Sequence, residues 1–298
     1  MFKLVSFICE DKLLYYSIIH KWKHLSQNEK SIYYLNEYGF QYNKALCSNP
    51  SAIHIIEKKK EFIDWHYLSM NKNAIHLLKQ NKEKICYTHL CYNINAIDLI
   101  MEHPEKINWT ILSSNINAIT ILEKNIDKIN WEELSKNKNA IHLILQNMDK
   151  VDWSNLCENE NALFILKKNM DKIYWSHLCK NENEDILYLL KLNIDKIDWY
   201  NLSKNKIAID LLRQNIDKIN WYNLSRNPNA HLILKDYPNK VYWPYILENP
   251  CIFQYDYDYM KKNMNLIREE LMQVCFHPTR LLYYLEHYNY DIGIEEYV

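Results

Sequence analysis

Apolar residues recur along the chain with the spacing of short helices. In the segment 73–81, N-A-I-H-L-L-K-Q-N, they fall at positions i, i+1, i+3 and i+4, which is one face of a helix rather than strand alternation. A second run at 131–137 places Trp131, Leu134 and Ser135 on one helical face. Each predicted helix has only about two turns, and helices that short are unstable alone. We therefore expect helix–turn–helix units that are held together by their neighbours.

The unit repeats every 22 residues, and several positions keep the same phase. A tryptophan marks most copies, with Tyr87 in the gap and Asn43 at the equivalent place one period earlier: Trp65, Trp109, Trp131, Trp153, Trp175, Trp199, Trp221 and Trp243. The single step of 24 residues, from Trp175 to Trp199, has its two extra residues in the segment 181–185, where a loop absorbs them at little cost. A leucine or isoleucine follows three residues after the aromatic position, and an asparagine follows six residues after it in every copy: Asn49, Asn71, Asn93, Asn115, Asn137, Asn159, Asn181, Asn205, Asn227 and Asn249.

This periodicity predicts an all-α fold, an α-solenoid of tandem 22-residue helix–turn–helix repeats with terminal caps. Residues 1–42 would form an N-terminal cap with a degenerate repeat, residues 43–249 the repeats, and residues 250–298 a C-terminal helical cap. The alternative is a leucine-rich-repeat-like solenoid, whose period also includes 22 and whose asparagines stack in a ladder. That fold needs an L-x-L strand before the asparagine, where this chain has W-x-x-L-S-x-N.

The asparagines allow several structural interpretations. Some precede the second helix and are expected to cap its N-terminus: Asn73, Asn95, Asn117, Asn139, Asn161 and Asn229. Others follow that helix and suit a left-handed residue at its end: Asn81, Asn125, Asn147, Asn169, Asn193 and Asn215. Residues before the tryptophan are candidate caps of the first helix: Asp64, Asn130, Asp152 and Asp198. The invariant asparagine either caps a helix or forms a buried ladder from repeat to repeat.

The tryptophan row has a structural and a functional interpretation. Aromatic rings in series are typical of surfaces that stack bases. The strict phase of the row with isoleucine and leucine instead favours a place in the core, wedged between successive helix pairs.

Composition narrows the function classes. The 36 Lys and Arg residues balance the 37 Asp and Glu residues, so no net charge points to nucleic acid or to an anionic membrane. Only two glycines are present, which excludes glycine-rich phosphate-binding loops. Neither a signal-peptide core nor a membrane-spanning segment is evident. We expect a protein that is neither secreted nor transmembrane. The many Asn, Ile, Lys and Tyr residues are those of AT-rich codons.

With its repeat unit N-x-N-A-I-x-L-L-x-x-N-x-D-K-I-x-W-x-x-L-S, seen at 137–144 and 149–159, the chain resembles the short-repeat proteins of giant DNA viruses related to Mimivirus. The segment from Glu269 to Leu282 is similar to endings common in those proteins. The resemblance spans roughly residues 43 to 290. The resemblance implies a viral origin and a location in the host cytoplasm or the virion. It implies no activity.

The cysteines and histidines are expected to be structural. Cys47, Cys91, Cys157 and Cys179 stand four residues after the aromatic position, where other copies have serine, so the position requires a small residue rather than a thiol. We expect all eight cysteines to be free thiols in a reducing compartment. His54, His76 and His142 share a variable position that indicates an exposed face, and His277 and His287 lack a third ligand. We therefore expect no catalytic residue, no cofactor and no metal ligand.

The leading hypothesis for function is a non-enzymatic scaffold or adaptor for protein–protein interaction. A solenoid exposes its variable positions along an extended surface, and here these positions are rich in tyrosine, a residue favoured at binding surfaces. The candidate interaction residues are Tyr67, Tyr92, Tyr200, Tyr222 and Tyr245. The expected partners are viral or host proteins, with no nucleic acid, membrane or small-molecule substrate. A virion structural component is the alternative, and a nucleic-acid-binding repeat array is less favoured.

Overall fold

The computed structural model describes residues 2–4, 43–58 and 60–255. The chain divides into two compact units, Leu4–Phe253 and Met1–Lys3 with Gln254–Val298. Most of the predicted N-terminal cap and the predicted helices after residue 255 lie outside the described residues. The repeats all belong to the first unit.

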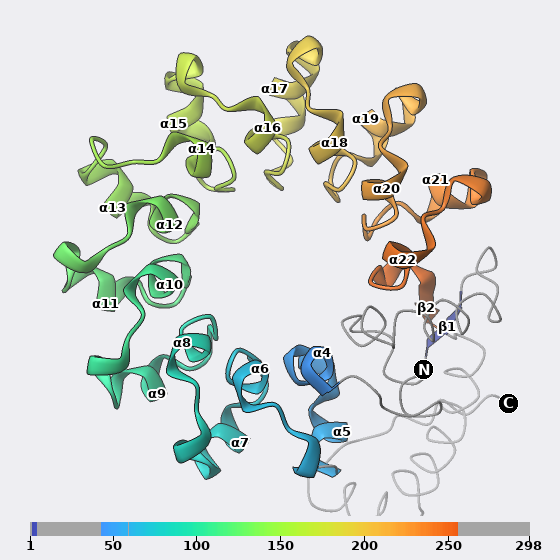
Figure 1. The fold of residues 1–298 in the computed structure, drawn as a ribbon. Helices are drawn as coiled ribbons and strands as arrows, with labels where there is room; N and C mark the ends of the chain where they lie inside the picture. Colours follow the sequence, from blue (N-terminus) through green and yellow to red (C-terminus); the bar gives the residue numbers. More distant parts are fainter. Residues whose placement is uncertain (1, 5–42, 59, 256–298) are drawn as a thin grey trace, which may run out of the picture. The chain divides into compact units, whose positions relative to one another are not determined.

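Each described repeat before Trp243 contains two short α-helices, and the repeat that begins at Trp243 has one in the described residues, which confirms the α-solenoid (Figure 1). The first helices are α4 (Asn43–Ser48), α6 (Trp65–Ser69), α8 (Tyr87–Leu90), α10 (Trp109–Ser114), α12 (Trp131–Lys136), α14 (Trp153–Leu156), α16 (Trp175–Leu178), α18 (Trp199–Leu202), α20 (Trp221–Leu224) and α22 (Trp243–Ile246). The second helices are α5 (Ile53–Lys58), α7 (Ile75–Gln80), α9 (Ile97–Met101), α11 (Ile119–Glu123), α13 (Ile141–Gln146), α15 (Leu163–Lys168), α17 (Ile186–Leu192), α19 (Ile209–Arg213) and α21 (His231–Asp236).

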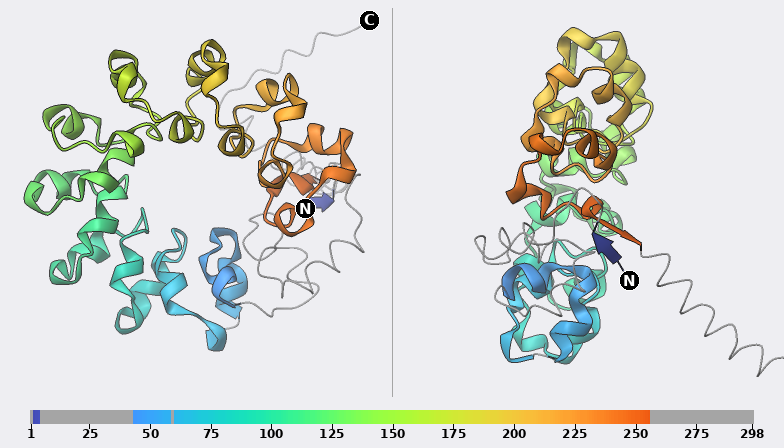
Figure 2. Two further views of the ribbon diagram at one scale, coloured as in Figure 1. Left: turned by 45° about the horizontal axis from the view of Figure 1, so that its top comes forward. Right: turned by 90° about the vertical axis from the view of Figure 1, so that its right-hand side faces the viewer.

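Within this unit the first helices and the second helices form two separate rows, which the views of Figure 2 also show. First helices of consecutive repeats pack on one another, as α10 does on α12 and α12 on α14. The leucine-rich alternative is wrong, because W-x-x-L-S forms a helix and not a strand in the described repeats.

Shorter elements complete the described residues. Most second helices are followed by a single 3-10 turn: η2 (Lys60–Phe62), η3 (Lys82–Lys84), η4 (Pro104–Lys106), η5 (Ile126–Lys128), η6 (Met170–Lys172), η7 (Ile194–Lys196), η8 (Ile216–Lys218) and η9 (Pro238–Lys240). Two more 3-10 turns, η1 (Pro50–Ala52) and η10 (Pro250–Ile252), follow first helices. The strands β1 (Phe2–Leu4) and β2 (Phe253–Tyr255) pair in a two-stranded sheet, which the sequence patterns did not predict.

The core is a continuous row of small and branched side chains, and tryptophan is not part of it. Leu134, Ala140 and Ile144 belong to the repeat that begins at Trp131 and are fully shielded from solvent. The equivalent residues of neighbouring repeats are buried as well.

The tryptophans are only half-buried, so their predicted place in the core is wrong. A lysine near the end of the same repeat lies over the ring instead: Lys84 over Trp65, Lys128 over Trp109, Lys150 over Trp131, Lys172 over Trp153, Lys196 over Trp175 and Lys218 over Trp199, with Nζ 4.5–5.1 Å from the ring centroid. One face of each of these rings is therefore covered by a cation–π contact.

The invariant asparagines form a buried ladder, which decides between their two interpretations. The Nδ2 amide of Asn159 donates to the backbone oxygens of Ser135 and Asn137 in the preceding repeat, both at 3.0 Å. Its Oδ1 accepts the backbone N–H of Asn161 at 3.0 Å. The same pairs of donor bonds join consecutive repeats from Asn71 to Asn249. Because a buried carbonyl oxygen needs a donor, each rung fixes the register between two repeats.

The other asparagines correct two predictions. Those expected to cap the second helices do not, since the N-cap residue there is an alanine without a side-chain cap bond, such as Ala74. Asn73 and its equivalents instead donate from Nδ2 to a backbone oxygen 23 residues earlier. These bonds form a second, exposed ladder. Asn81 is not left-handed, because its φ is −138°, and its Nδ2 donates to the Leu77 oxygen at the helix end. The first-helix caps are confirmed: Asp64, Asn130, Asp152 and Asp198 accept backbone N–H bonds.

The serine or cysteine four residues after the aromatic position is a second link between repeats. The Ser135 hydroxyl donates to the Trp131 oxygen at 2.7 Å and accepts the backbone N–H of Asp152 at 3.1 Å. In the cysteine copies the sulfur takes the acceptor role, as Cys157 Sγ does for the Tyr174 N–H at 3.3 Å. A small residue is therefore not sufficient, because the position also supplies an acceptor. Burial raises the pKa of the Cys157 thiol to about 11, and it keeps the sulfur protonated.

The longer repeat absorbs one of its two extra residues in the predicted loop before α17 and the other in α17 itself, compared with the repeat before it. The ladder continues across them, because Asn205 Nδ2 reaches the Asn181 oxygen at 2.7 Å over 24 residues. α17 is the longest of the second helices in the described residues, with seven residues.

Candidate interaction surface

The ladder and core residues leave certain positions free to vary, and the predicted tyrosines occupy some of them. The structure exposes Tyr200, Tyr92, Tyr67 and Tyr222, with 55%, 51%, 36% and 36% of their surface accessible. Tyr245 is half-buried and differs from the others in this respect. The tyrosines do not form one surface: Tyr67 and Tyr92 lie in early repeats, whereas Tyr200, Tyr222 and Tyr245 belong to three consecutive late repeats.

The structure brings Tyr222 and Tyr245 together and adds Tyr242, which the sequence analysis did not single out. The three ring centroids lie 4.2–5.2 Å apart in edge-on and tilted arrangements. The hydroxyl groups of Tyr222 and Tyr245 also share a hydrogen bond. We call these three side chains the tyrosine cluster. Tyr242 stands directly before Trp243, where most other described repeats have a capping Asp or Asn, and that departure was a signal in the sequence.

A cation completes the tyrosine cluster. The guanidinium carbon of Arg226 lies 3.3 Å from the Tyr245 ring centroid and 6.0 Å from that of Tyr222. Arg226 Nε lies 3.6 Å from a Glu248 carboxylate oxygen and has no hydrogen bond to a described residue. Stacked aromatic rings with an arginine present rigid, amphipathic area, and these residue types dominate the energetics of protein interfaces. Chemically, the cluster is suited to recognition.

A second surface that sequence reasoning missed lies on α17. Tyr188 and Leu192 are among the most exposed apolar side chains of the described residues, at 67% and 64%. Tyr188 lines a shallow hollow of about 710 Å³ together with Leu187, Ile207 and Ile209. The two-residue extension before α17 was the signal for this surface.

The histidines at the shared variable position of the second helix are exposed, as predicted. His76 Nε2 lies 2.6 Å from a Glu57 oxygen, and His142 Nε2 lies at the same distance from a Glu123 oxygen. His76 and His142 therefore each pair with a carboxylate of the preceding repeat. His277 and His287 lie outside the described residues.

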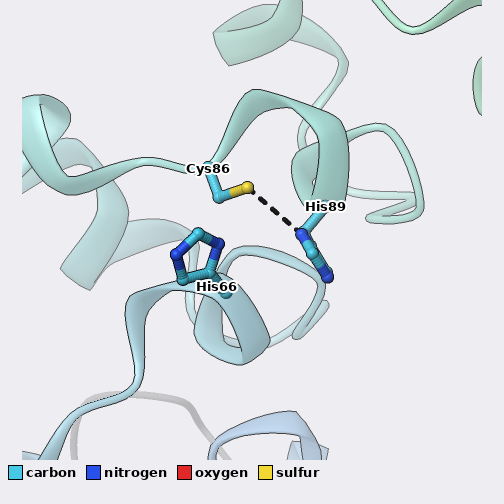
Figure 3. Close-up of side chains that lie close together, drawn as sticks. All are labelled: His66, Cys86 and His89. Carbon is cyan, nitrogen blue, oxygen red and sulfur yellow. Dashed lines mark hydrogen bonds between the residues drawn. The ribbon is translucent and has the colours of Figure 1, made fainter.

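Three further residues gather beside Tyr67, although sequence reasoning expected no metal ligands. His66, Cys86 and His89 bring one nitrogen or sulfur atom each to within 4.8 Å of one another (Figure 3). The Tyr67 and His89 ring centroids are 6.1 Å apart. The C-x-x-H spacing from Cys86 to His89 was the available signal, together with a histidine one repeat earlier.

The chain matches no protein-family model, no curated protein and no solved structure. Within the described ranges, no helix has both the length and the apolar composition needed to cross a membrane.

Proposed function

We propose that this chain is a non-enzymatic scaffold that binds another protein through the late repeats. The observation that carries the proposal is the tyrosine cluster with Arg226 stacked on it. The backbone contacts between repeats use the asparagine, serine and cysteine positions, so the cluster is not required for the ladder. Its residues occupy positions that differ between repeats, where partner choice can be encoded.

Rigid aromatic side chains lose little conformational entropy on binding, which favours tyrosine as an anchor. Tyr222 and Tyr242 are 36% and 41% exposed and already held by ring contacts. Tyr200, at the same repeat position as Tyr222 and one repeat earlier, extends the exposed aromatic area. The expected partner presents an apolar pocket or groove with hydrogen-bond acceptors for the hydroxyl groups.

The resemblance to repeat proteins of giant DNA viruses makes infected cells the place to search for the partner. The test captures partners with the wild-type chain and with a Tyr222→Ala/Tyr242→Ala variant, then measures direct binding of each purified partner. Tyr92→Ala is the matched control, because Tyr92 is equally aromatic and 51% exposed but lies in an early repeat.

A hot-spot residue typically contributes 2 kcal/mol or more, so the double variant should weaken binding at least about 30-fold. Tyr92→Ala should leave binding unchanged. A partner that binds the double variant as tightly as the wild type would refute the tyrosine cluster as the binding surface. Equal thermal unfolding of the variants establishes that a loss of binding is not a loss of folding.

A further inference from the structure

The three-residue group in the early repeats combines ligand atoms from two consecutive repeats. His66 lies on α6, Cys86 directly precedes α8, and His89 lies on α8 (Figure 3). Cys86 Sγ is 3.1 Å from His89 Nδ1, and the two imidazole centroids are 5.6 Å apart at an interplanar angle of 74°. In a tetrahedral zinc site, with Zn–N near 2.0 Å and Zn–S near 2.3 Å, neighbouring ligand atoms lie about 3.3–3.6 Å apart. The three ligand atoms lie within 4.8 Å of one another, which is at most about 1.5 Å wider than that spacing.

Comparison with the other repeats shows that Cys86 does not make the backbone cap bond that most of them have at this position. The residue before the aromatic position caps the first helix in many repeats, as Asn108 and Asn130 do by accepting a backbone N–H. Cys86 stands at this position without a side-chain cap bond. The helix therefore lacks a stabilising contact that an asparagine would supply.

The two histidines are also distinct from others in the described repeats. His76, His103, His142 and His177 each lie beside a glutamate oxygen, at 2.6–3.1 Å. His66 and His89 instead gather around a sulfur atom. His66 is exposed, and Cys86 and His89 are half-buried, so an ion can enter from solvent without opening the core.

We propose that His66, Cys86 and His89 bind one Zn²⁺ ion that bridges two repeats. A set of two imidazoles and one thiolate is typical of zinc. Binding replaces the proton of the Cys86 thiol, which passes to solvent, and water occupies the fourth position. The site is independent of the proposed protein-binding function.

The test is titration of the metal-free full-length chain with Co²⁺ and Zn²⁺, using thiolate-to-cobalt charge-transfer absorption and competition with a chromophoric chelator. The variants take residues that other repeats carry at the same positions, so that each is expected to fold: Cys86→Asn, His66→Thr and His89→Asn. Cys91→Ser is the matched control. Cys91 is a buried thiol whose pKa is raised by burial, and serine occupies its position in other repeats.

We expect one equivalent of metal and a charge-transfer band for the wild type and for Cys91→Ser. Cys86→Asn should lose the band. Each ligand variant should weaken zinc binding more than about 100-fold, since loss of an outer-shell partner alone typically costs 10–100-fold. Absence of stoichiometric binding by the wild type would overturn the proposal. Retention of the band in Cys86→Asn, or its loss in Cys91→Ser, would place the thiolate ligand elsewhere and would overturn it equally.

Discussion

Removing one rung of the asparagine ladder should weaken the array far more than removing the neighbouring exposed asparagine. Asn159 is 1% exposed and makes three hydrogen bonds, two from Nδ2 and one to Oδ1. In Asn159→Ala the Ser135 oxygen loses its ladder donor in a buried place, which costs about 1–3 kcal/mol. The Asn137 oxygen keeps a second donor, the Ala140 N–H at 3.0 Å. The variant also loses the bond from Nδ2 to the Asn137 oxygen and the bond from the Asn161 N–H to Oδ1. Each of these two losses adds about 0.5–1.5 kcal/mol to the destabilisation.

The expected loss of unfolding free energy for Asn159→Ala is therefore about 2–6 kcal/mol. Two further variants test the reasoning. Asn159→Asp keeps the size and the Oδ1 acceptor, but it places a carboxylate oxygen against two carbonyl oxygens, so it should destabilise at least as strongly as alanine. Asn161→Ala removes one exposed bond to the Lys138 oxygen and should cost less than about 1 kcal/mol.

The assay is urea unfolding of the full chain, followed by far-UV circular dichroism and by tryptophan fluorescence. Solenoid stability is approximately a sum of nearest-neighbour terms, so a lesion at Asn159, in the middle of the described repeats, should also divide the transition into two. A loss below about 1 kcal/mol for both Asn159 variants would refute the ladder as the main link between repeats.

Further predictions concern single positions. Trp153→Ala should cost about 2–3 kcal/mol by urea unfolding, below the 3–5 kcal/mol of a fully buried aromatic residue, because Trp153 is half-buried. Tyr200→Ala, at an exposed position, should stay within about 0.5 kcal/mol of wild type in the same assay. The pKa of the Cys157 thiol is raised from 9.0 to about 11, so its contribution to stability is present below pH 9 and is lost as the pH rises to 11. Unfolding at pH 7, 9 and 11 should show a smaller alkaline loss for Cys157→Ser than for wild type. Cys86→Asn should stabilise the metal-free chain by about 0.5–1 kcal/mol in thermal unfolding, because it supplies the missing cap.

The repeat itself could be predicted because its constraints are local and recur. Leu134 and Ile144 follow helical spacing, and an Asp or Asn before the tryptophan has the known chemistry of a cap, so the helices and the solenoid follow from them. The role of Asn73 could not be inferred in the same way. Its backbone oxygen partner lies 23 residues earlier, and only the stacking geometry of two repeats brings them together.

The same limit applies to the tryptophans and to the candidate sites. A fixed phase shows that Trp153 is constrained, but it does not distinguish full burial from a ring half covered by Lys172. The tyrosine cluster and the group of His66, Cys86 and His89 both cross repeat boundaries. Their members are separated by about one period, so the distance between them depends on the rotation from one repeat to the next.

Some positions of the repeat bond to the neighbouring repeat and others are free to vary, and this difference explains where such sites arise. The asparagine and the serine or cysteine satisfy buried backbone groups of the neighbouring repeat, so a change there is penalised wherever it occurs. The side chains directly before and after the tryptophan are not needed for these bonds, and a cap can be given up for about 1 kcal/mol. Cys86 and Tyr242 both stand at the cap position, and each lies beside side chains from the adjacent repeat. Tyr174 also stands at the cap position without a side-chain cap bond, and neither candidate site includes it. Two of the three departures from the cap among the described repeats therefore coincide with the candidate sites, which is the pattern expected when a repeat array acquires binding sites without disturbing its ladder.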